Sequence, residues 1–227
     1  MSQAHQTKSQ PGRTGTDAPQ RAPNLLARLI GLGRPVVMGI LNVTPDSFSD
    51  GGRFFDPQRA IEHAHHLAAA GADILDIGAE STRPYGGAVA VPHEEEWRRL
   101  EQVLPAVRAL GVPVSIDTMK SSVALAALAA GAGMVNDVWG LQRDGDLARV
   151  VALHKVPVII MHNREAADPE IDIMADIAAF FSRSLDIAAR AGIARENIVL
   201  DPGIGFGKTP EQSITAIARL GELKSFG

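Results

Sequence analysis

The chain of 227 residues contains no cysteine. This absence excludes a disulfide framework, a thiolate metal site and a cysteine nucleophile. The sequence also lacks an apolar run of the roughly 20 residues that a membrane-spanning helix needs. Residues 1–21 are rich in Gln, Ser, Thr and Gly and contain no apolar stretch typical of a secretory leader. We therefore expect a soluble, cytoplasmic protein with no membrane partner.

An excess of positive charge is absent as well. Lys and Arg total 22 against 26 Asp and Glu, giving a net charge of -4. A chain with this charge composition lacks the excess positive charge that attracts a nucleic-acid phosphate backbone, so nucleic acid is a poor partner. A small molecule is the expected ligand, and His, carboxylate, hydroxyl, Lys and Arg side chains remain for its chemistry.

Alternating apolar runs and Ala-rich stretches organise the rest of the chain. Residues 1–21 are predicted to be a disordered tail, and the folded domain is expected over 22–227. The six apolar runs, each typical of a buried parallel strand, are VVMGILNV (36–43), ADILDIG (72–78), PVSIDT (113–118), GMVNDVW (133–139), VPVIIMH (156–162) and NIVLDP (197–202). The predicted helices are 57–70, 94–110, 121–130, 145–154 and 173–191. This alternation predicts an α/β fold with a parallel sheet, either open and doubly wound or closed as a barrel.

Polar residues end these apolar runs: Asn42, Asp76, Asp117, Asn136, His162 and Asp201. One such residue is explained by helix capping or a turn. For the whole set a shared polar pocket is the better interpretation, because unpaired carboxylates inside strands cost several kcal/mol. In a barrel all strand ends meet at one mouth, so the pattern favours a barrel with a polar ligand.

Two motifs combine hydroxyls, acids and glycines after a strand. GILNVTPDSFSDGG (39–52) places Asn42 where a neutral oxygen could bind Mg²⁺, although an Asx turn is the alternative for Asp46 and Asp50. DIGAESTRP (76–84) contains Arg83, whose guanidinium suits a pyrophosphate or carboxylate, although a surface salt bridge is the commoner use of a single Arg.

Three further motifs follow later strands: VSIDTMK (114–120), VNDVW (135–139) and LDPGIGFGK (200–208). Asp117 and Asn136, at adjacent strand ends, could read the edge of a flat heterocycle. The glycine spacing near Phe206 does not form a dinucleotide fingerprint, because no first-strand context supports it.

Taken in this order, the five motifs resemble dihydropteroate synthases, over about residues 35–227. LNVTPDSFSDGG (41–52) is the most specific of them. The resemblance implies a TIM (β/α)8-type barrel and the condensation of a pterin pyrophosphate with 4-aminobenzoate in folate biosynthesis, with Mg²⁺ as cofactor. The reaction it implies is substitution at the exocyclic methylene of the pterin, without a protein nucleophile.

By the same resemblance, Asp117, Asn136 and Asp201 hydrogen-bond the pterin, and Asp201 accepts from its 2-amino and N3 groups. Asn42 holds Mg²⁺ on the pyrophosphate. Packing against the ring is implied for Val138, Met161 and Phe206, although a place in the barrel core explains Val138 and Met161 nearly as well.

The resemblance also implies that Thr82 and Arg83 are the candidate catalytic residues, on a loop that closes over the pyrophosphate and the 4-aminobenzoate. Pro84 would touch the second substrate. The segment from Tyr85 departs from the glycine that commonly follows this proline in the family, and we interpret the difference as loop variation.

The family pattern continues into seventh and eighth strands that carry Lys, Arg and His ligands. We therefore expect about six of eight βα units in this sequence, truncated before strands 7 and 8, and we expect the chain alone to be inactive and poorly folded. A homodimer is a further expectation. Three rival functions stay open: a non-catalytic or inactive pterin-binding fragment, a methyltetrahydrofolate-binding methyltransferase, and a zinc hydrolase using His63, His65, His66 and His162.

Overall fold

The computed structural model describes residues 25–44, 56–80 and 90–226 of the chain. The tail predicted over residues 1–21 lies outside these ranges. Six parallel strands form one sheet in the order β1 to β6, so that each strand pairs with its predecessor along the chain. The strands are β1 (Met38–Asn42), β2 (Ile74–Gly78), β3 (Val114–Asp117), β4 (Met134–Asp137), β5 (Val158–Met161) and β6 (Ile198–Asp201). All six predicted strands are confirmed.

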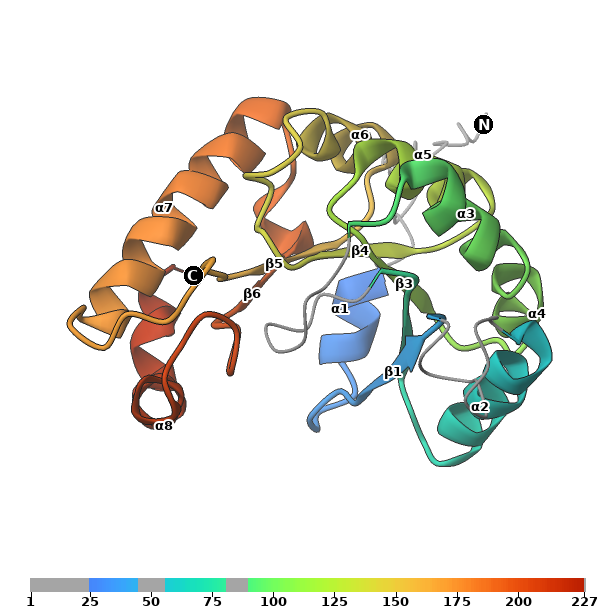
Figure 1. Ribbon diagram of the computed structural model, residues 1–227, viewed down its shortest axis with the longest axis horizontal. Helices are drawn as coiled ribbons and strands as arrows, with labels where there is room; N and C mark the ends of the chain where they lie inside the picture. The colour runs from blue at the N-terminus through green and yellow to red at the C-terminus, as the bar shows by residue number, and fades with distance from the viewer. Residues whose placement is uncertain (1–24, 45–55, 81–89, 227) are drawn as a thin grey trace, which may run out of the picture.

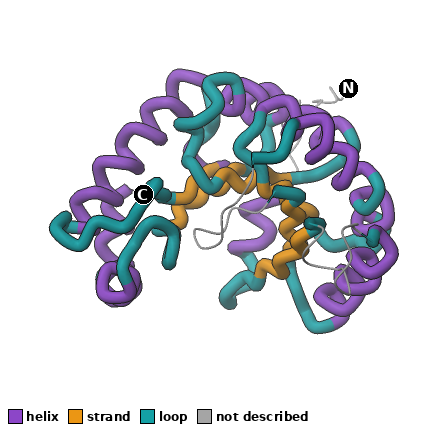
Figure 2. Tube along the Cα trace, in the orientation of Figure 1, coloured by secondary structure: helices purple, strands orange, loops and turns teal. Residues whose placement is uncertain are grey.

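The sheet curves into an arc with helices along its convex side (Figure 1). Within the described residues β1 and β6 are the two edges, so the arc is open, as the tube in Figure 2 also shows. The helices are α1 (Leu25–Ile30), α2 (Pro57–Ala69), α3 (His93–Glu101), α4 (Leu104–Arg108), α5 (Ser121–Ala129), α6 (Leu147–His154), α7 (Ile173–Ala191) and α8 (Pro210–Ala218), with short 3₁₀ turns at Arg195–Asn197 and Leu220–Phe226. None of the described helices has the length and apolar character needed to cross a bilayer.

The two faces of the sheet pack against different parts of the chain, because successive side chains of a strand point to opposite sides. The outward face packs on the helices in one large apolar cluster that includes Leu75, Ile116, Ile160 and Phe181. On the inward face, Ile74, Met134 and Ile159 pack together with Leu29 of α1. Helix α1 therefore closes the inside of the arc at the end where the strands begin, and leaves the polar residues to the other end.

One predicted helix is wrong in its extent. The stretch 94–110 was expected to be continuous, but it divides into α3 and α4. Pro105 lies in the first turn of α4 and has no backbone N–H to continue an α-helix from the preceding turn. Residues 102–103 consequently form a turn between the two helices.

Helix α8 is an element that the apolar pattern did not predict. Its first turn carries a capping box, in which Thr209 accepts from the backbone N–H of Gln212 and the Gln212 side chain accepts from that of Thr209. The spacing of Thr and Gln, followed by a proline at the first helical position, was a readable signal for a helix start.

Candidate active site

The predicted site residues gather at the carboxyl end of the inner face. Asp117 of β3 lies opposite Asn136 of β4 in the sheet register, and Asp201 of β6 lies opposite Met161 of β5. Asn42 ends β1 opposite Gly78, which is itself paired with Asp117. The strands thus bring Asn42, Asp117, Asn136 and Asp201 to one end of the arc, as the strand-end argument predicted.

Asn136 is held by a carboxylate one layer deeper in the arc. Its Nδ2 donates to Oδ2 of Asp76 at 2.8 Å. Asp76 is only 2% exposed, and burial raises the pKa of its carboxyl group, while the hydrogen bond from Asn136 acts in the opposite direction. Because this bond turns the amide nitrogen toward Asp76, the Asn136 oxygen faces away from that carboxylate and can accept from a ligand.

Asp117 contributes an acceptor with unused capacity. Its Oδ1 atom is buried, and within the described residues it has no hydrogen-bond partner. Burial raises the pKa of Asp117 well above its usual range, and the nearby carboxyl group of Asp76 raises it further. An unsatisfied buried oxygen is costly, so a donor supplied by a ligand would be favoured at this position.

The three residues predicted to contact a ring differ in their surroundings. Val138 and Met161 are 3% and 4% exposed, yet neither is part of the two apolar clusters found among the described residues. Phe206 is half-buried on the loop that follows β6. Val138 and Met161 are therefore buried, and both a core role and a place against a ligand remain predictions for them.

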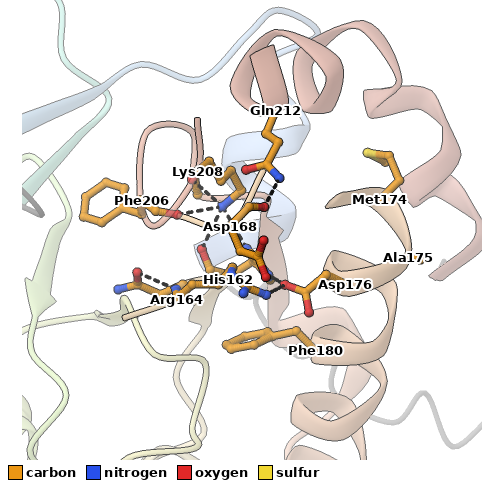
Figure 3. A network of polar contacts seen from close by, with 12 residues as sticks. His162, Arg164, Asp168, Met174, Ala175, Asp176, Phe180, Phe206, Lys208 and Gln212 are labelled. Atoms are coloured by element: carbon orange, nitrogen blue, oxygen red, sulfur yellow. Dashed lines mark hydrogen bonds and ion pairs between the residues drawn. The ribbon is translucent and has the colours of Figure 1, made fainter. Parts of the chain in front are cut away.

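A polar network supports this end of β5 and β6 (Figure 3). Lys208, 2% exposed, donates to the carbonyl oxygens of Gly203 at 2.7 Å and Phe206 at 3.0 Å, and contacts Nδ1 of His162 at 2.8 Å. His162 Nε2 lies 3.0 Å from Oδ2 of Asp176, which also accepts from Arg164 at 2.8 Å. The sequence motif LDPGIGFGK contained Lys208, but nothing in its pattern predicted that its ammonium group is buried.

A second network fixes the ends of the segment between the described residues 80 and 90. The ammonium group of Lys120 pairs with the carboxylates of Glu80 and Glu96, which are 9% and 0% exposed. Glu80 also accepts from the backbone N–H of Val91 at 3.2 Å. The side chain of Glu80, which Lys120 holds, therefore connects residue 80 before this segment to Val91 after it.

Three predicted site residues, Thr82, Arg83 and Pro84, lie outside the described residues. The zinc alternative can be compared in part: His162 uses both ring nitrogens in the network of Lys208 and Asp176, and the described residues hold no group of three His, Cys, Asp or Glu suited to a metal ion. This arrangement does not support a zinc hydrolase.

Sequence comparison with known proteins shows the family to which this chain belongs. The family model of pterin binding enzymes matches residues 38–227. The chain belongs to that family. It is 47% identical over 195 residues to the dihydropteroate synthase of Clostridium beijerinckii, covering 86% of this chain and 71% of that protein. It is 46% identical to the enzyme of Bacillus subtilis, covering 82% and 65%.

Solved structures agree. A dihydropteroate synthase from Clostridium difficile, crystallised in the presence of pteroic acid, matches with a TM-score of 0.80 and 49% identity over 86% of this chain and 73% of that one. The enzyme of Xanthomonas albilineans with 4-aminobenzoic acid matches with a TM-score of 0.79, 46% identity and coverage of 85% and 70%. Within its family the chain groups with the dihydropteroate synthases, transferases of folate biosynthesis. The predicted fold class is confirmed: the six described parallel strands match part of the barrel of these synthases.

Proposed function

We propose that this chain binds a pterin pyrophosphate and 4-aminobenzoate and joins them into dihydropteroate with release of pyrophosphate. The observation that carries the proposal is the buried Oδ1 of Asp117, which has no hydrogen-bond partner among the described residues and lies beside Asn136, whose amide is oriented by Asp76. The edge of a pterin alternates hydrogen-bond donors and acceptors, so a carboxylate and an oriented amide at neighbouring strand ends suit it.

In this proposal Asp117, Asn136 and Asp201 hold the ring by its polar edge, with Asp201 accepting from the 2-amino and N3 donors. Val138, Met161 and Phe206 lie against the ring and exclude water. Support comes from the register, which puts Asp201 opposite Met161 and Asp117 opposite Asn136. A ring held in this way is oriented for attack at its exocyclic methylene group.

The reaction then exchanges one bond for another. The bond between the methylene carbon and the pyrophosphate oxygen breaks, pyrophosphate leaves with the electron pair, and the amine nitrogen of 4-aminobenzoate bonds to the carbon and loses a proton. No protein nucleophile is required. Exclusion of water by the apolar side chains protects the electron-poor carbon from hydrolysis. Thr82, Arg83 and Pro84 stay predictions for the contacts to pyrophosphate and 4-aminobenzoate.

We propose Mg²⁺ as the metal and Asn42 as its protein ligand. Asn42 is half-buried at the end of β1. Its neutral amide oxygen suits an ion that takes most of its ligands from pyrophosphate and water. When bound, it would offset the negative charge that develops on the leaving pyrophosphate. A homodimer remains a prediction.

The test is release of pyrophosphate that requires both substrates. Asp201→Asn should lower the rate roughly 100-fold, because hydrogen bonds to a charged group contribute about 1.5–3 kcal/mol each. Asp186→Asn, an exposed position on α7, is the matched control and should have little effect. Release that depends on both substrates and on Asp201 supports the proposal. Pterin binding without release would instead favour the non-catalytic pterin-binding function, and neither binding nor release would contradict both.

A further inference from the structure

Lys208 is a charged side chain in a place where an apolar one would be expected. It is among the largest fully buried side chains of the described residues. Burying an ammonium group costs several kcal/mol unless its protons are all bonded. Here the carbonyl oxygens of Gly203 and Phe206 and the ring nitrogen of His162 accept from it, and the His162 carbonyl lies 3.5 Å away. The loop that follows β6 thus folds around the ammonium group and bonds to it through two carbonyl oxygens.

The ammonium group of Lys208 determines which atoms in this network donate and which accept. An ammonium group has no acceptor, so Nδ1 of His162 must accept from Lys208, and the proton of the neutral ring is on Nε2. That nitrogen donates to Oδ2 of Asp176, which also accepts a hydrogen bond from Arg164. Burial and the charge of Lys208 lower the pKa of His162 to about 4, which keeps the ring neutral. The edge of Phe180 on α7 packs against it, with ring centroids 4.9 Å apart.

The loop lies directly on the end of β5. Gly203 has a φ of +65°, and a Cβ placed there would be 1.9 Å from the carbonyl oxygen of His162. Gly207 has a φ of +54°, and its Cβ would be 2.5 Å from the carbonyl oxygen of Arg164. Both positions accept only glycine, because a side chain would separate the two strands' loops. Lys208 supplies the polar bonds across this close contact.

Two proposed ligand residues depend on this loop. Phe206 is held by its carbonyl oxygen, and in Figure 3 its ring points away from Lys208. Asp201 accepts from the backbone N–H of Gly203 at 2.8 Å, and Lys208 donates to the carbonyl oxygen of the same residue. The same ammonium group therefore fixes the backbone beside both residues.

We propose that Lys208 is a positioning residue that holds Phe206 and Asp201 in their places for the pterin ring. The role rests on the proposed function, because it assumes that these two residues meet the pterin. Lys208 itself need not touch the ligand. It acts through the geometry of the loop 203–208 against residues 162–164.

The experiment is a double-mutant cycle with Lys208→Met and Phe206→Ala, in which the Kd of 6-hydroxymethyl-7,8-dihydropterin pyrophosphate is measured with Mg²⁺ present. Lys208→Met should weaken binding roughly 10- to 100-fold, about the contribution of a hydrogen bond to a charged group such as Asp201. In the Phe206→Ala background the same change should cost less, because the contribution of the positioned ring is gone and only the positioning of Asp201 is lost. Lys224→Met, an exposed lysine, is the control.

A spectroscopic readout accompanies the cycle. Removal of the Lys208 charge should raise the pKa of His162 in an NMR titration. Wild-type affinity in Lys208→Met, or equal and additive losses in both backgrounds, would overturn the positioning role. If Lys208→Met does not unfold cooperatively, Lys208→Gln, which keeps a donor for the carbonyl oxygens, is judged by the same affinities. A wild-type chain that fails to bind the pterin would defeat the proposed function, whereas equal affinities in binding-competent chains would defeat only the role of Lys208.

Discussion

Asn136 donates to Asp76 across the intervening strand β3, at 2.8 Å and over 60 residues of sequence. Both residues point into the arc, and the buried acid sets which atom of the amide can face a ligand. The orientation of an amide is otherwise weakly determined, since its two ends are similar in size. Asp76 thus acts on the proposed pterin site without needing to contact the pterin.

Asp76→Asn tests that relationship. The variant replaces an acceptor by an amide whose nitrogen can face Asn136, so the orientation of Asn136 becomes mixed. We expect the Kd for the pterin pyrophosphate to rise roughly 10-fold, the loss of about one hydrogen bond. Calorimetry measures it against Asp186→Asn. An unchanged Kd in a folded variant would show that Asp76 does not orient the site.

Lys120→Met should destabilise the chain by about 3–5 kcal/mol, because it leaves the buried carboxylates of Glu80 and Glu96 without their cation. Urea unfolding measures this, with the exposed Lys224→Met as control. Adding Glu96→Gln to Lys120→Met should restore part of the loss, since one uncompensated charge is removed. A loss below about 1 kcal/mol would mean that the pair contributes no more than a surface salt bridge.

Asp137 gives a pH dependence whose sign can be worked out. Burial raises its pKa to about 6, against an ordinary value of 3.8, so the folded chain binds this proton more tightly than the unfolded chain. Its contribution to the free energy of unfolding is fully present below about pH 3.8 and is lost as the pH rises through 6. The shift of about two pKa units corresponds to roughly 3 kcal/mol.

The comparison is urea unfolding of the wild type and Asp137→Asn at pH 4, 5.5 and 7. The wild type should exceed the variant most at pH 4, and the difference should shrink toward pH 7. Other groups, among them His162, titrate in both proteins and largely cancel. A difference that is constant with pH would contradict the raised pKa of the buried Asp137 carboxyl group.

Gly203 and Gly205 form a matched pair on the loop after β6. Both have positive φ, +65° and +84°, but only a Cβ at Gly203 would collide with the His162 carbonyl oxygen, while the space at Gly205 is open. Gly205→Ala should cost about 1–2 kcal/mol for the backbone conformation alone. Gly203→Ala should cost more and also weaken pterin binding, as thermal unfolding and calorimetry would measure. Equal effects would mean that the loop does not depend on its contact with β5.

The strands and the strand-end residues were readable from the sequence for a physical reason. A parallel strand buried on both faces reads as a continuous apolar run, so Asp117, Asn136 and Asp201 stood out against it. Parallel strands also end on the same side, which put these residues together before any coordinates were known. Family resemblance supplied the barrel and the roles, which periodicity alone could not.

The supporting networks were not readable. The bond from Asn136 to Asp76 depends on how far the strands are offset, and the burial of Lys208 depends on a loop whose glycines take positive φ. Such backbone choices leave only a weak trace in sequence. The division of 94–110 was different, because Pro105 was visible and its lack of a backbone N–H should have placed the break.

The most direct test of the whole account is calorimetric binding of 6-hydroxymethyl-7,8-dihydropterin pyrophosphate, with Mg²⁺, to the wild type, Asp201→Ala and the exposed control Asp186→Ala. The account predicts binding to the wild type and to the control, and loss of binding in Asp201→Ala with its cooperative unfolding retained. Equal binding by all three would contradict the assignment of the strand-end residues to the pterin site.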